Sequence, residues 1–379
     1  MPRRPSRKPR APSRDLSVPE TEIVYSADEG DVGKRLDRFL DERLPWRSRT
    51  TMVRFIEDGR VRVSGELVRR KAKPLRRGDV VVLAVPPPRV EVRHEELARE
   101  LEILHEDEDL LAIAKPAGLI VHPVGKNRFN TLIQALHWRY RRDPAIRTAG
   151  RPPVIPKICH RLDKDTSGVL LVALNDRARA RIQEIFEERT VEKEYLAVVS
   201  GTLEPEEGLI DRPIGPDPDG KLSTAMCVRP DGDRSRTRFR VLERLPGATA
   251  VRFDLETGRQ HQIRVHAASL GHPVLLDPIY GPWELGARWP TEGDIIIARH
   301  ALHARRIALP HPRTGDRLEL VAPVPADLRG LIDGLRTLGR PAVPHPPGAC
   351  EGPGGRPPTP AAGFPAYPAD DPRPYPATP

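Results

Sequence analysis

Asp163 is the residue whose type and surroundings most favour chemistry. It lies in the segment His-Arg-Leu-Asp-Lys-Asp-Thr-Ser-Gly at 160–168, directly before the apolar run at 169–172. Such a run predicts a strand, and a strand would hold the preceding carboxylate in a rigid loop. A carboxylate held in this way is suited to act as a nucleophile or a base. The residues alone are equally compatible with a carboxylate that only caps the following turn.

Three other segments, at 109–123, 186–195 and 257–266, also embed polar side chains in apolar or turn-like sequence. The last passes through a Gly258 turn into a predicted helix that carries Arg264. Arg264 could be one more arginine in an arginine-rich chain. Tyr195 alternates with small apolar residues, so a plain core position is its alternative reading.

No metal or nucleotide motif accompanies these segments. The sequence contains no GxxxxGK[ST], no GxGxxG after a strand, no HExxH and no paired CxxC. Among His160, His261 and His266, the last two are five residues apart on a predicted helix and therefore face different directions, which argues against zinc. The sequence thus predicts chemistry without a metal or a cofactor, on an RNA or sugar substrate.

The charge of the chain favours a polyanionic partner. The 379 residues carry a formal net charge of +9, and cationic patches raise encounter rates with phosphate backbones. A compositional bias is the competing explanation, because 52 of the 62 basic residues are arginine. The three scattered cysteines fit a reducing compartment. With no apolar signal core and no run of about 18 apolar residues, we expect a cytoplasmic protein that does not enter a membrane.

Composition divides the chain into four parts. Residues 1–30 begin as a basic, proline-rich stretch and are expected to form a disordered arm, and residues 341–379 a disordered proline-rich tail. Prolines at 86–88 mark a boundary after a small α/β unit at 31–88. That unit is crowded with basic residues, which predict a surface that follows phosphates; a merely solvated basic face is the alternative. The candidates are Arg47, Arg49, Arg54, Arg69, Arg70 and Lys71.

Residues 100–330 are expected to form the main domain. Strands are predicted at 110–114, 168–173, 195–199, 238–242 and 248–255, and helices at 130–142, 176–188 and 260–270. The order lacks the regular alternation of a doubly wound sheet. We therefore predict the α+β class, with a mixed, largely antiparallel sheet and flanking helices.

Taken together, the motifs resemble the RluA-type family of pseudouridine synthases, over about residues 31–325. The string at 160–168 is the most specific. Support comes from Lys-Pro-Ala-Gly at 115–118, the 193–195 segment, Gly-Arg-x-His-Gln-Ile-Arg-Val-His at 258–266, Asp-Pro-x-Tyr-Gly at 277–281, and Leu-His-Ala at 302–304 leading to His-Pro at 311–312. The unit at 31–88 resembles an S4-type RNA-binding domain.

The resemblance implies a reaction and roles for particular residues. A uridine would be flipped out, its N1–C1′ bond broken, and its uracil rotated and rejoined through C5, without metal or cofactor. Asp163 matches the family's catalytic aspartate, Arg264 the arginine that pairs with it, and Tyr195 the aromatic residue that stacks on the base. Arg161 matches a position that enters the RNA helix. RNA contacts are expected from His160, Lys193, Arg259 and His261.

The resemblance leaves the substrate open. Large-subunit ribosomal RNA is the leading expectation, transfer RNA the alternative, and a non-catalytic RNA-binding or ribosome-assembly protein the competing class. A monomer is expected. Three departures from the family pattern bear on which uridine is modified: Gln260 in place of Thr or Ser, Leu276 in place of Gly, and no arginine after Ile214-Gly215.

Overall fold

The computed structural model describes residues 15–19, 21–44, 48–88, 90–124, 127–146, 154–220, 222, 224–281 and 297–338. Its first part is a small domain in which two helices cover a four-stranded antiparallel sheet of order β1-β4-β2-β3. The elements are β1 (Glu22–Ser26), η1 (Glu29–Asp31), α1 (Leu36–Arg43), α2 (Arg49–Glu57), β2 (Val61–Val63), β3 (Glu66–Val68) and β4 (Val80–Ala84). Apolar side chains from both helices and the sheet form one buried core.

The start of this domain corrects the expected boundary. Strand β1 pairs with β4 along its whole length, from Glu22 to Ser26, although the sequence assigned residues up to 30 to a disordered arm. The strand is short and follows a basic, proline-rich stretch, so its pattern does not stand out from that of the arm. The other expected boundaries stay predictions, and residues 1–14 and the tail at 341–379 lie outside the described residues.

A short segment before β1 contacts the large domain. The backbone N–H of Leu16 donates to His137 Nδ1 (3.2 Å), and the backbone carbonyl of Ser17 lies 3.0 Å from His94 Nδ1. The Asp15 carboxylate accepts a hydrogen bond from Arg142. His94 belongs to α3 (His94–Glu100) and His137 to α4 (Leu132–Arg141), so this segment is attached to both helices.

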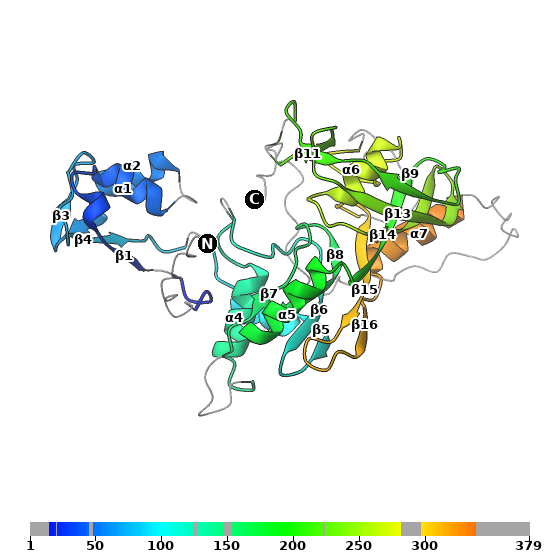
Figure 1. Ribbon diagram of the computed structural model, residues 1–379, viewed down its shortest axis with the longest axis horizontal. Helices are drawn as coiled ribbons and strands as arrows, with labels where there is room; N and C mark the ends of the chain where they lie inside the picture. The colour runs from blue at the N-terminus through cyan, green and yellow to red at the C-terminus, as the bar shows by residue number, and fades with distance from the viewer. Residues whose placement is uncertain are drawn as a thin grey trace, which may run out of the picture.

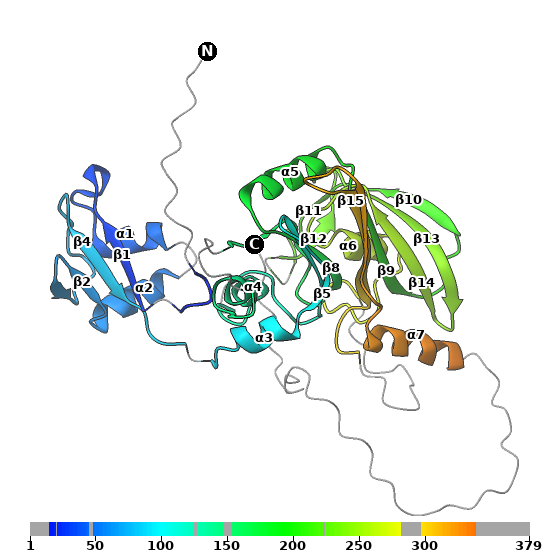
Figure 2. The same ribbon diagram turned by 90° about the horizontal axis from the view of Figure 1, so that it is seen from below.

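The large domain is built on a ten-stranded sheet (Figures 1 and 2). Eight strands follow the order β10-β13-β14-β9-β15-β8-β6-β5, with β16 beside β15 and β7 beside β8. The strands are β5 (Glu102–Glu106), β6 (Leu110–Lys115), β7 (Lys157–Ile158), β8 (Ser167–Ala173), β9 (Glu192–Ser200), β10 (Glu207–Asp211), β13 (Arg236–Leu245), β14 (Ala248–Leu255), β15 (Leu302–Pro310) and β16 (Arg317–Val321). A separate hairpin joins β11 (Ile214–Pro216) to β12 (Met226–Val228).

Nearly all pairings in this sheet are antiparallel, and β15 with β8 is the parallel pair. The predicted α+β class with a largely antiparallel sheet is therefore confirmed. The strands predicted from apolar runs are all present as β6, β8, β9, β13 and β14. The three predicted helices are α4, α5 (Asp176–Glu187) and α6 (Gln262–Ser269).

Alternation along the strands directs side chains to two faces, and helices cover both. Leu170 and Val172 of β8 pack with α3 and α4, whereas Val169 and Leu171 pack with α5 on the opposite face. Beyond β15, helices α6 and α7 (Ala326–Leu338) pack against the second half of the sheet. The two halves meet at β8, β15 and β9, which is where the segments of interest converge.

In the part of the chain that the structure describes, no helix has the length and apolar character needed to cross a membrane.

Candidate active site at the centre of the sheet

Asp163 lies in the loop between β7 and β8, and 30% of its side chain is exposed. The loop is fixed at several points. The backbone N–H of Thr166 donates to the Asp163 carbonyl (3.2 Å), and the Thr166 hydroxyl lies 2.8 Å from Nε2 of the buried His300. The carboxylate is therefore presented to solvent from a rigid loop, as the sequence predicted.

Gly168 explains how the loop enters the sheet. It has a φ of +122°, and a Cβ atom there would lie 2.1 Å from the backbone oxygen of Ala304. The close approach arises because β8 pairs in parallel with β15 at this residue. Only glycine permits this crossing, so Gly168 sets the position of the strand that follows Asp163.

Lys115 holds the other side of the loop. Its side chain is buried, and its ammonium donates to the backbone carbonyls of Pro116 (2.8 Å), Leu119 (3.0 Å) and Lys164 (2.9 Å). Burial lowers the pKa of Lys115 to about 7. The bond to the carbonyl of Lys164, the residue after Asp163, makes Lys115 a positioning group for the loop that carries Asp163.

Arg264 reaches the loop from the first turn of α6 and joins two carboxylates. Its Nη1 donates to Asp163 Oδ2 (3.0 Å), while Nε and Nη2 donate to the two oxygens of Asp277 (2.6 and 2.8 Å). Asp277 is fully buried and also accepts from the backbone N–H groups of Ile279 and Tyr280. The forked guanidinium suits this arrangement, so Asp277 fixes the arginine that faces Asp163.

The surroundings of Asp163 keep it ionised. Burial raises the pKa of its carboxyl, but its interactions with His261, with the Arg264 guanidinium and with His300 outweigh that effect and bring the pKa below its ordinary value of 3.8. An ionised carboxylate at neutral pH is the form needed for a nucleophile or base. The neighbouring Asp277 has a lowered pKa as well: burial opposes this, and Arg264 prevails.

Tyr195 lies on β9, across β15 from the strand that follows the Asp163 loop, and is partly buried between the cores of the two halves of the sheet. Burial, and secondly the charge of Asp163, raise the pKa of its hydroxyl well above 10.0. The ring is therefore neutral, close to the carboxylate and partly open.

The other residues expected to contact RNA surround this centre at different depths. His160 is half-buried, its ring lies 5.7 Å from that of Phe186, and its Nε2 accepts from the backbone N–H of Leu171. The Lys193 ammonium lies 5.9 Å from the Phe186 ring centroid. Arg161 is exposed, and Arg259 is exposed with an ion pair to Asp233 (3.4 Å).

The basic candidates of the small domain that the structure describes lie on its surface. Arg49 lies 3.5 Å from Asp37, Arg54 lies 3.9 Å from Asp58, and Lys71 lies 3.9 Å from Glu57. The Asp37 carboxylate is buried, whereas the other two pairs are exposed on both sides and are worth about 0–1 kcal/mol each. All three cations are exposed and therefore accessible to phosphates. Arg69 and Arg70 are exposed as well, whereas Arg47 lies outside the described residues.

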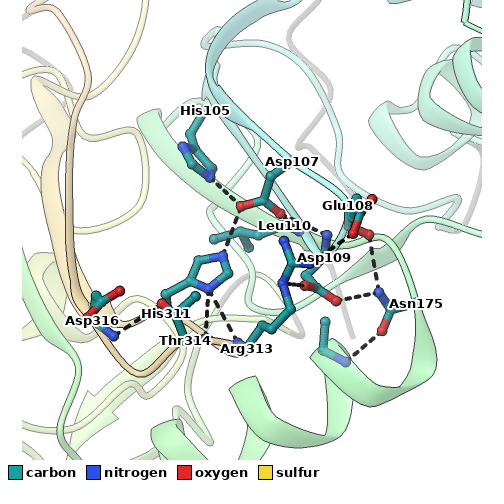
Figure 3. Close-up of polar contacts among 11 residues, drawn as sticks. His105, Asp107, Glu108, Asp109, Leu110, Asn175, His311, Arg313, Thr314 and Asp316 are labelled. Atoms are coloured by element: carbon teal, nitrogen blue, oxygen red, sulfur yellow. Dashed lines mark hydrogen bonds and ion pairs between the residues drawn. The ribbon is translucent and has the colours of Figure 1, made fainter.

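A histidine–aspartate cluster lies elsewhere, at the turn between β5 and β6 (Figure 3). Among the described residues, His105, Asp107 and His311 are close enough to share a metal ion. Both histidines instead place Nε2 2.8 Å from the same Asp107 oxygen. Nδ1 of His311 accepts from two backbone N–H groups, so its Nε2 carries the proton and donates. The cluster is a hydrogen-bonded clasp between two hairpins, and the absence of a required metal stays a prediction.

Sequence reasoning overlooked four side chains that shape the site: Lys115, Asp277, Tyr280 and His300. The first three occur in motifs that were noticed for their resemblance to a family, but nothing local assigns them a partner. Asp277 and Arg264 are 13 residues apart with a turn between them, and His300 reaches Thr166 over 134 residues. These contacts depend on tertiary structure.

Comparisons with known proteins identify the family of the chain. Residues 109–269 match the family model of RNA pseudouridylate synthases, and residues 34–81 match that of the S4 domain. The chain is 38% identical to the RNA pseudouridine synthase YlyB of Bacillus subtilis, over 84% of this chain and 99% of that protein. It therefore belongs to the RNA pseudouridine synthase family, and it is an enzyme that acts on RNA.

Two further relatives carry more specific names. The ribosomal large subunit pseudouridine synthase D of Nitrosomonas europaea is 36% identical over 90% of this chain and 96% of its own length. The protein of the same name from Xanthomonas campestris is 39% identical over 85% of this chain and 94% of its own.

Proposed function

We propose that the enzyme converts specific uridines of large-subunit ribosomal RNA to pseudouridine, with Asp163 as its catalytic carboxylate. The observation that carries this proposal is the ion-pair chain Asp163–Arg264–Asp277 beside Tyr195. The names of the relatives from N. europaea and X. campestris favour ribosomal over transfer RNA. The enzyme acts in the cytoplasm, as a monomer and without metal or cofactor.

The target uridine must first leave its helix, at a cost of a few kcal/mol. Arg161 is exposed beside the catalytic loop and takes the place of the flipped base. Tyr195 stacks on the uracil. Exposed cations of the small domain, among them Arg69 and Arg70, hold the surrounding phosphates.

Asp163 then breaks the N1–C1′ bond, either as a nucleophile on C1′ or as a base on the ribose. A single carboxylate is enough because the uracil leaves and returns without water, whereas a glycosidase needs a second carboxylate. Arg264 keeps Asp163 ionised and oriented. The rotated uracil rejoins the ribose through C5.

The test is pseudouridine mapping, by carbodiimide modification and primer extension, in cells that lack this protein. We expect one or a few large-subunit sites to disappear and to return with the wild-type gene but not with Asp163→Asn. Loss of sites in transfer RNA alone would support the same reaction with transfer RNA as the substrate. An unchanged map, in a strain without a redundant enzyme, would support a non-catalytic RNA-binding protein instead.

A further inference from the structure

His261 is a residue of the site whose polar contacts are incomplete among the described residues. It precedes α6, has a left-handed φ of 54°, and only 7% of its side chain is exposed. Nδ1 lies 2.7 Å from the hydroxyl of Tyr280. Nε2 lies 3.9 Å from Asp163 Oδ2, which is too far for a hydrogen bond, and it has no other partner among the described residues.

The hydrogen-bond network determines which nitrogen carries the proton. The backbone N–H of Met226 donates to the Tyr280 oxygen (3.0 Å). The single hydroxyl proton of Tyr280 then has His261 Nδ1 as its acceptor. If Nδ1 carried a proton, the hydroxyl proton would have no acceptor among the described residues. The neutral imidazole therefore carries its proton on Nε2, the nitrogen that faces Asp163.

The ring is neutral under physiological conditions. Burial lowers the pKa of His261, and the charge of Arg264 adds to this against the opposing effect of Asp163. The Nε2–H of this largely buried side chain has no acceptor among the described residues, and a left-handed conformation at a non-glycine residue adds strain of the kind found at functional sites. Both features are expected if a substrate oxygen supplies the missing acceptor.

We propose that His261 is a second catalytic residue, whose Nε2–H donates to a carbonyl oxygen of the uracil while the glycosidic bond is broken. This inference rests on the proposed function. As N1–C1′ breaks, its electron pair passes to the uracil and spreads from N1 onto O2 and O4. C1′ bonds to an Asp163 oxygen, or Asp163 takes the C2′ proton to leave a glycal. In either route the uracil is a monoanion, which a preorganised N–H donor stabilises.

The same donor serves the second half of the reaction. Rotation of uracil by a half turn about its N3–C6 axis exchanges N1 with C5 and O2 with O4. When C5 bonds to C1′, the ester bond to Asp163 breaks, or the glycal regains its C2′ proton. The C5 proton is then lost and N1 takes a proton. An oxygen occupies the position facing His261 both before and after the rotation.

Two variants of equal length test the inference: His261→Gln keeps an N–H donor near the position of Nε2, and His261→Met has none. Both meet the same backbone strain at residue 261. Single-turnover tritium release would be measured on large-subunit ribosomal RNA transcripts and total transfer RNA labelled at C5 of uridine. We expect His261→Met to slow the reaction by roughly 10²–10³-fold, the usual effect of losing one such donor. RNA affinity should change by less than about threefold, and His261→Gln should be within about tenfold of wild type.

Substituted RNA identifies the acceptor. Sulfur accepts hydrogen bonds weakly, so 2-thiouridine or 4-thiouridine at the target should slow the wild type and leave His261→Met almost unaffected. Equal rates for the Gln and Met variants, or a wild-type rate for His261→Met, would overturn the donor role while the function stands. A wild-type enzyme that releases no tritium from either RNA would overturn the proposed function together with this inference.

Discussion

Asp277 offers the sharpest test of how the site is held together. Its carboxylate is fully buried and accepts two hydrogen bonds from Arg264 and two from backbone N–H groups. Asp277→Asn preserves size but removes the charge and turns one acceptor into an NH₂ group, which cannot accept from Arg264. Breaking a buried ion pair costs about 3–5 kcal/mol. Arg264 keeps Asp163 as a partner, so we expect the free energy of unfolding to fall by about 3 kcal/mol, the lower end of this range.

For a domain of this size each kcal/mol lowers Tm by about 2–4 °C, so calorimetry should show a fall of about 6–12 °C. The loosened guanidinium no longer orients Asp163, and we expect a rate loss of about 10²-fold. Asp254→Asn is the matched control. Asp254 also accepts a fork, from Arg252, but its side chain is 36% exposed, so its loss should cost less than about 1 kcal/mol. Equal melting temperatures for Asp277→Asn and Asp254→Asn would refute the reasoning.

Three further predictions follow from other contacts. Lys115→Met leaves three backbone carbonyls without their donor. The free energy of unfolding measured with urea should fall by about 2 kcal/mol, and the reaction should be slower. Wild-type activity would contradict the positioning role. Asp107 has a pKa far below 3.8: burial raises it, but hydrogen bonds, including those from both histidines, prevail. Because the folded-state pKa is depressed, this stabilisation is present above about pH 4 and is lost as pH falls through the folded pKa. The difference in the free energy of unfolding between wild type and Asp107→Asn, measured with urea, should shrink from pH 5 towards pH 2. A pH-independent difference would contradict the stabilising role of the Asp107 hydrogen bonds. Replacing Arg69, Arg70 and Lys71 by glutamine should weaken RNA binding and reduce the salt slope by up to about 3, with an unchanged slope arguing against RNA docking by these side chains.

Periodicity predicted the elements with strong apolar patterns and missed those without them. Strand β8 is buried at every residue, and its apolar run is plain in the sequence. Strand β15 contains Arg305 and Arg306 among its apolar residues, and its central place depends on neighbours from β8 and β9. Strand β1 is an edge strand of five residues. Elements of this kind are defined by their partners, which a local pattern does not contain.

The same limit applies to the site. Local pattern identified Asp163 as a candidate, but its contact with Arg264 spans 101 residues, and the sequence predicted that pair only through a family resemblance. Leu276 shows what a departure from the family pattern means physically. It stands where glycine is usual, and it has a φ of 59°, a conformation that glycine adopts without strain. Leucine at this position therefore adds backbone strain to the turn before Asp277 that glycine would avoid.

The central claim is that the Asp163 carboxylate performs the chemistry. The most direct test is single-turnover tritium release with purified wild type and Asp163→Asn on large-subunit ribosomal RNA transcripts labelled at C5 of uridine. Filter binding of the same RNA would run in parallel. We expect Asp163→Asn to bind RNA with an affinity close to that of wild type and to release no tritium above background. Release at the wild-type rate by Asp163→Asn would contradict the mechanism.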